Sequence, residues 1–144
     1  DQQPAAETHG AFIEAGGSVF TWRDDRCLEA ELFMSLSDDA IGKLIDMAVD
    51  LHGEDLIGGH IQSRATNGET LEDIQIQAQT DGYCAQTRNV LANASSIRKK
   101  GWFKQLGWME QAAREIIGPD LLNADPDFKT AVETIFEWAG NAAA

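Results

Sequence analysis

Cys27 and Cys84 are the residues whose type and number most constrain the chemistry of this chain. An even cysteine count in a small chain that begins with Asp1 is typical of an exported protein with one disulfide. We therefore expect a Cys27–Cys84 disulfide in a periplasmic or secreted protein. It would stabilise the fold by about 4 kcal/mol on the chain-entropy model and would leave no free sulfur for nucleophilic catalysis. The alternative is a pair of reduced thiols in a cytosolic protein.

A second group combines imidazole and carboxylate side chains. His52, Glu54, Asp55 and His60 stand between the end of a predicted helix and a glycine-rich segment. Both side-chain types bind zinc, and a loop could hold them around one ion. Because the spacing matches no zinc motif, a metal site of His52, Glu54 and His60 is the alternative hypothesis. It would make the chain a small metal-binding protein or a metal-dependent enzyme.

Sequence signatures of catalysis are absent. The chain has no Gly-x-Ser-x-Gly elbow, no phosphate-binding glycine loop and no dinucleotide fingerprint. The sequence therefore predicts a non-enzymatic protein without a cofactor.

The net charge of −13 is concentrated in residues 1–55, which hold 13 acidic and three basic residues. Such a field repels nucleic acid and anionic membranes and speeds encounter with cationic proteins. We expect a partner protein with a basic cleft, no nucleic-acid partner, and a role such as that of an inhibitor or immunity protein. The expected contacts lie in the acidic face and in the 53–68 connection: Asp24, Asp25, Glu29, Glu31, Asp38, Asp39, Glu54, Asp55 and His60.

Residues 98–104 mix cations with aromatic rings. This pattern could bind an anionic surface, a glycan or an acidic patch of a partner. The interpretation that we favour places Trp102 and Phe103 in the core and leaves the lysines in solvent.

The elements that must position these residues are helices. Apolar residues at three- and four-residue spacing predict five helices in an all-α, single-domain bundle. Their approximate ranges are 24–36, 37–52, 71–93 with a kink at Asp81-Gly82, 102–117 and 125–139. Residues 53–68 are expected to form a long flexible connection. The helical domain should span 9–140, between a flexible N-terminus (1–8) and a frayed tail (141–144). No apolar run is long enough to cross a bilayer.

Overall fold

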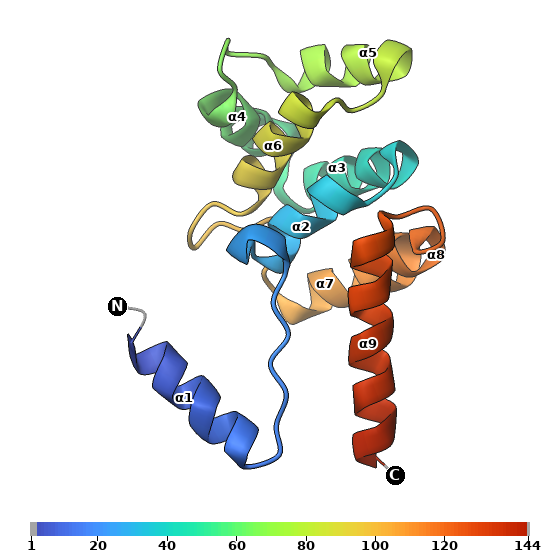
Figure 1. Cartoon of the computed structure of the whole chain (residues 1–144). Coiled ribbons are helices and arrows are strands. Elements are labelled where there is room, and N and C mark those ends of the chain that lie inside the picture. Colours follow the sequence, from blue (N-terminus) through green and yellow to red (C-terminus); the bar gives the residue numbers. More distant parts are fainter. Residues whose placement is uncertain (1–2, 144) are drawn as a thin grey trace.

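The computed structural model describes residues 3–143, and within them the side chains of residues 8, 10–141. These residues form an all-α domain of eight helices without strands (Figure 1). The helices are α1 (Gln3–Glu14), α2 (Leu28–Ser35), α3 (Asp38–His52), α4 (Glu54–Arg64), α5 (Leu71–Asp81), α6 (Ala85–Ser95), α7 (Leu106–Ala112) and α9 (Pro126–Ala143). A π-helical segment (Ala113–Ile117) and the single turn α8 (Gly118–Asp120) prolong α7 without interruption.

Figure 1 shows α1 set apart from the other helices and joined to them by an extended segment. Residues 3–8 of the predicted flexible terminus lie in α1, and residues 1–2 are outside the described part. The extended segment contacts α9 through two aromatic pairs. Phe20 meets Trp138 edge to face, with ring centroids 6.1 Å apart, and Trp22 stacks on Phe128, with ring centroids 5.5 Å apart. Of the predicted tail, residues 141–143 belong to α9.

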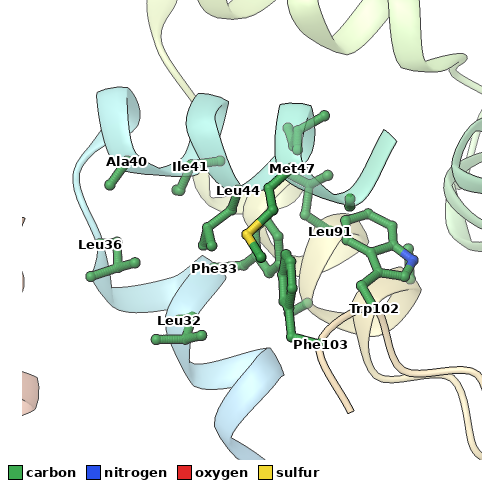
Figure 2. Close-up of a cluster of buried hydrophobic side chains, with 14 of the residues drawn as sticks. Leu32, Phe33, Leu36, Ala40, Ile41, Leu44, Met47, Leu91, Trp102 and Phe103 are labelled. Atoms are coloured by element: carbon green, nitrogen blue, oxygen red, sulfur yellow. The ribbon is translucent and has the colours of Figure 1, made fainter. Parts of the chain in front are cut away.

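The core forms where α2, α3 and α6 meet. Ser37 caps α3 by accepting a hydrogen bond from the Ala40 N–H at 3.3 Å, which satisfies one of the free donors at the helix start. The predicted apolar stripe of α3 is buried except at its last member, Leu51, which is half-buried. Figure 2 shows Ile41 and Leu44 of this stripe directed towards the side chains of α2. The same core contains the side chains of Leu32, Phe33, Leu36, Leu91, Trp102 and Phe103.

The predicted Cys27–Cys84 disulfide is wrong, because both cysteines are exposed and unpaired. Cys27 directly precedes α2, and Cys84 directly precedes α6. These helices pack antiparallel, since Arg88 in the first turn of α6 donates to the Leu36 carbonyl at the end of α2, at 2.8 Å. The eight residues of α2 separate the cysteines by about 12 Å, beyond the roughly 7 Å between Cα atoms that a disulfide can bridge. Without the disulfide, export stays a prediction.

The 53–68 segment was expected to be a flexible connection, and this expectation is also wrong. Residues 54–64 form α4, which packs on α6. Ile57 and Ile61, one turn apart, are fully buried and hold the helix against the core in spite of Gly58 and Gly59. Residues 71–93, expected as one kinked helix, form two, because Gly82 adopts a left-handed φ of 71° and ends α5.

Within residues 3–143, no helix combines the length and the apolar character that crossing a bilayer requires.

Candidate functional site

Trp102 fixes the segment between α6 and α7 (residues 96–105) to the core. Its side chain is fully buried, and its ring meets that of Phe33 edge to face, with centroids 5.5 Å apart. Its backbone N–H donates to the Ser95 carbonyl at 3.0 Å. Exposed lysines stand two positions before and two positions after Trp102, so the buried rings of Trp102 and Phe103 hold a cationic segment at the surface.

Two histidines satisfy the remaining polar groups of Trp102. His52 Nε2–H donates to the Trp102 carbonyl at 2.7 Å, and Trp102 Nε1–H donates to His60 Nδ1 at 3.2 Å. Because its Nδ1 accepts, neutral His60 carries its proton on Nε2. Burial lowers the pKa of His60, and the positive charges of Lys100, His52 and Arg64 lower it further. The neutral form that the Trp102 hydrogen bond requires is therefore favoured.

A cavity of about 590 Å³ opens beside these histidines. Its walls come from the end of α3, from α4, from the segment before α7 and from α7 itself. Its aromatic wall is Trp108, whose indole meets the His52 imidazole edge to face at 4.8 Å. The lining residues are His52, Leu56, His60, Lys99, Lys100, Gly101, Trp102, Lys104, Gln105 and Trp108.

The cations of the chain divide into two groups. Six of the eleven lysines and arginines form ion pairs with carboxylates: Arg23, Arg26, Lys43, Arg88, Arg114 and Lys129. The other five are Arg64, Arg98, Lys99, Lys100 and Lys104, and within the described side chains none has a carboxylate at ion-pair distance.

Four of these five cations lie in or near the cavity. Lys99, Lys100 and Lys104 line it, and Arg98 precedes them in the chain. Arg64 lies close enough to His60 to lower the pKa of the imidazole. Positive charge without a partner is thus concentrated on one region of a protein whose net charge is −13.

Glu31, expected at a partner contact, is instead a buried structural group that is 1% exposed. Arg23 Nη2 and Arg26 Nη1 each donate to its carboxylate at 3.0 Å, and the Ser35 hydroxyl donates at 2.7 Å. Burial by itself raises the pKa of Glu31. The hydrogen bonds from Ser35, Arg26 and Arg23 outweigh burial, so that this pKa lies below its ordinary value of 4.5.

Most other residues of the predicted acidic face are paired within the chain. Asp24 pairs with Arg26 at 2.8 Å, and Asp39 pairs with Lys43 at 2.7 Å. Asp38 pairs with Arg88 at 2.8 Å and also accepts from the Tyr83 N–H. Asp25 is exposed beside this group, and Glu29 is half-buried in the first turn of α2.

The predicted metal ligands are only partly brought together. His52 and His60 reach the same cavity, but Glu54 and Asp55 are exposed in the first turn of α4 and do not line it. Across the described residues, no three His, Cys, Asp or Glu side chains are arranged to hold a metal ion. Both imidazoles are engaged with Trp102. The geometry therefore gives the metal hypothesis no set of ligands.

Sequence reasoning found the cations and rings of residues 98–104 but missed Leu56 and Trp108 as walls of a cavity. The sequence alone did not predict the cavity, because one of its sides is formed by α4, and the sequence predicts a flexible connection for those residues. Comparison of the chain with protein-family models, with curated proteins and with solved structures finds no match.

Proposed function

We propose that this protein is a binding protein whose ligand is anionic and occupies the cavity between α4 and α7. One observation carries the proposal: of the five cations that have no carboxylate partner among the described side chains, three line this cavity and a fourth, Arg64, lies near its His60. Cationic groups in a concave site raise the local concentration of anions, even where the whole molecule is acidic. The volume, about 590 Å³, is within the usual range of ligand sites.

The chemistry of the lining supports binding more than catalysis. Lysine ammonium groups, a glutamine amide and the His60 Nε2–H donate hydrogen bonds. Among the described residues, the lining contains no hydroxyl, thiol or carboxylate side chain. A site of this kind attracts and orients an anion but offers neither a serine or cysteine nucleophile nor a carboxylate base.

Quenching of tryptophan fluorescence by iodide and by caesium tests the proposal. A net charge of −13 should favour caesium around the molecule as a whole. Trp108 is half-buried among the lysines, so its emission should be quenched more strongly by iodide. The difference between the wild-type chain and the Trp108→Phe variant isolates the emission of Trp108.

A matched pair of double variants provides the control. Lys100→Gln with Lys104→Gln should remove the preference for iodide, because both lysines line the cavity. Lys43→Gln with Lys129→Gln makes the same change in net charge at lysines that are paired with carboxylates, and it should leave the preference intact. Quenching of wild-type Trp108 by caesium as strongly as by iodide would contradict the proposal.

A second candidate function is docking of a basic partner protein on α3, the mode of action expected of an inhibitor or immunity protein. Asp46 and Asp50, one turn apart, are exposed and form no ion pair among the described side chains. Hollows of about 710 and 350 Å³ flank them, and Asp46 lines both. Charge reversal by Asp46→Lys with Asp50→Lys should abolish binding of polylysine, whereas reversal at Asp127 should not. If both variants lose polylysine binding to the same extent, the binding reflects only the net charge of the protein, and docking on α3 is contradicted.

A further inference from the structure

We propose that the anionic ligand of this cavity is an aromatic acid, with one acidic head group on a flat apolar ring. This inference rests on the proposed function and narrows it to a class of small organic molecules. The cavity joins two chemistries that a simple inorganic anion would not use together: exposed lysine donors, here called its rim, and an apolar wall of Leu56 and Trp108.

The apolar wall is formed by Trp108 and Leu56. The Trp108 indole is half-buried and is held edge to face against His52. Leu56 is 45% exposed although it is a large aliphatic side chain on a helix that buries Ile57 and Ile61. A ligand ring placed between these two side chains would remove apolar surface from water, which favours binding. The interaction of the ligand ring with the Trp108 indole would add to the binding free energy through the quadrupoles of the two rings.

The cationic rim is formed by three lysines. The Lys100 N–H donates to the Ile97 carbonyl at 2.9 Å and closes a tight turn, in which Lys99 adopts a left-handed φ of 66°. This conformation is strained for any residue with a Cβ. The turn nevertheless brings two consecutive lysines to the same cavity, with Lys104 as a third. Ammonium groups on flexible stems can converge on one acidic head group without a fixed geometry.

The size of the cavity favours a small molecule over a protein segment. About 590 Å³ exceeds what a phosphate ion needs and lies within the range of pockets that bind small organic molecules, so that a ligand of one or two fused rings can enter it. Trp102, His52 and His60 belong to the lining, and two hydrogen bonds join the two histidines to Trp102, whose side chain is fully buried. An extended acidic peptide would instead lie across the rim and would leave the aromatic wall in contact with water.

Isothermal titration calorimetry of the whole chain with three probes tests the inference. We expect 2-naphthoate to bind about tenfold more tightly than 2-naphthamide, which has the same rings without the charge, and than inorganic phosphate, which has charge without rings. Lys100→Gln and Lys104→Gln should each weaken naphthoate binding by about two- to fivefold. Trp108→Ala should weaken it by about two- to tenfold. Lys129→Gln, remote and paired with Glu133, should leave it unchanged.

Three results would overturn the inference. Phosphate, or polyglutamate titrated as a fourth probe, binding at least as tightly as naphthoate would show that the site selects charge alone; the proposed function would then stand without its aromatic ligand. Equal binding of naphthamide would show that the lysines do not select the ligand. If no anion binds, and if caesium quenches the fluorescence of Trp108 more strongly than iodide does, the proposed function is refuted as well.

Discussion

Replacing Glu31 by glutamine should destabilise the fold by about 2–4 kcal/mol. Glu31 lies on α2, where its carboxylate joins three partners: Arg23 and Arg26 from the preceding segment, and Ser35 one turn further along the helix. Arg23 also reaches Asp125 beside the start of α9, at 3.3 Å. The carboxylate therefore ties the chain before α2 to the helix and, through Arg23, to α9. Glutamine keeps the shape of the side chain but removes its charge.

The magnitude follows from the partners that lose the carboxylate. Hydrogen bonds to charged groups contribute about 1.5–3 kcal/mol each, and loss of one member of a buried ion pair costs about 3–5 kcal/mol. Here the side chains of Arg23 and Arg26 are 41% and 23% exposed, so water recovers part of their interaction. Ser35 can still donate to the glutamine carbonyl. The expected loss is thus below the fully buried limit, at about 2–4 kcal/mol.

Urea unfolding followed by circular dichroism measures this difference, with Glu110→Gln as the control. Glu110 is 69% exposed and pairs with Arg114 at 3.6 Å, so its loss should cost less than about 0.5 kcal/mol. The pKa of Glu31 is lowered in the folded state, so its stabilisation is complete above the ordinary value of 4.5 and is lost as pH falls through the lowered pKa. The reasoning would be refuted if Glu31→Gln lowers the free energy of unfolding by less than about 1 kcal/mol. It would also be refuted if the difference between variant and wild-type protein stays the same in acid.

Three further variants test other contacts. Lys99→Gly should raise the free energy of unfolding by about 0.5–1 kcal/mol, because glycine relieves the strain of the left-handed backbone conformation. This gain exceeds the cost of the greater freedom of glycine in the unfolded chain. A lower urea midpoint for the variant would contradict the prediction. The pKa of His60 is lowered in the folded state, so the stability of the wild-type protein should fall as pH drops below 6.5. In His60→Gln the glutamine carbonyl can still accept from Trp102, and this pH dependence should be lost. Parallel pH profiles of the stability of the two proteins would contradict the reasoning. Ser37→Ala should cost about 1–2 kcal/mol, since the hydroxyl caps α3 and donates to Asp120 at 2.5 Å; an unchanged melting temperature would contradict it.

The sequence predicted those helices whose signals are local. Ser37 and the apolar stripe behind it identify α3, and the capping contact that they imply is present. Asp125 and Pro126 mark the start of α9, where the Asp125 carboxylate accepts from the Phe128 N–H at 3.3 Å. The position of the interruption at Asp81-Gly82 was also predicted, although it ends α5 and does not merely kink a single helix. In each case, residues within one turn of each other carry the information.

The sequence failed where packing overrides local preference. Gly58 and Gly59 favour a loop, but burial of Ile57 and Ile61 against the core forms α4. Trp102 was expected in a helix from 102 to 117; α7 begins at Leu106, and Trp102 is buried from within the preceding loop. Its burial was predicted correctly, although its conformation was not.

The candidate site could not be derived from the sequence because its parts are distant in the chain. His52 and Trp102, which share a hydrogen bond, are 50 positions apart. The sequence suggested metal ligation for His52 and His60 because imidazole is a common ligand, and nothing nearby in the sequence reveals that a tryptophan engages both. The cationic stretch was visible, but the pairing of the other cations appears only in the folded chain.

The antiparallel contact of α2 with α6 determines when the domain can fold during synthesis. Arg88 donates to the carbonyl of Leu36, the C-cap residue of α2, and the ring of Phe33 meets that of Trp102 edge to face, so the eight-residue α2 depends on residues made much later. A helix that short does not persist alone in water. A chain leaving the ribosome must therefore expose α2 and α3 without their partners until α6 and Trp102 have emerged. We expect the whole core to form in one late, cooperative step.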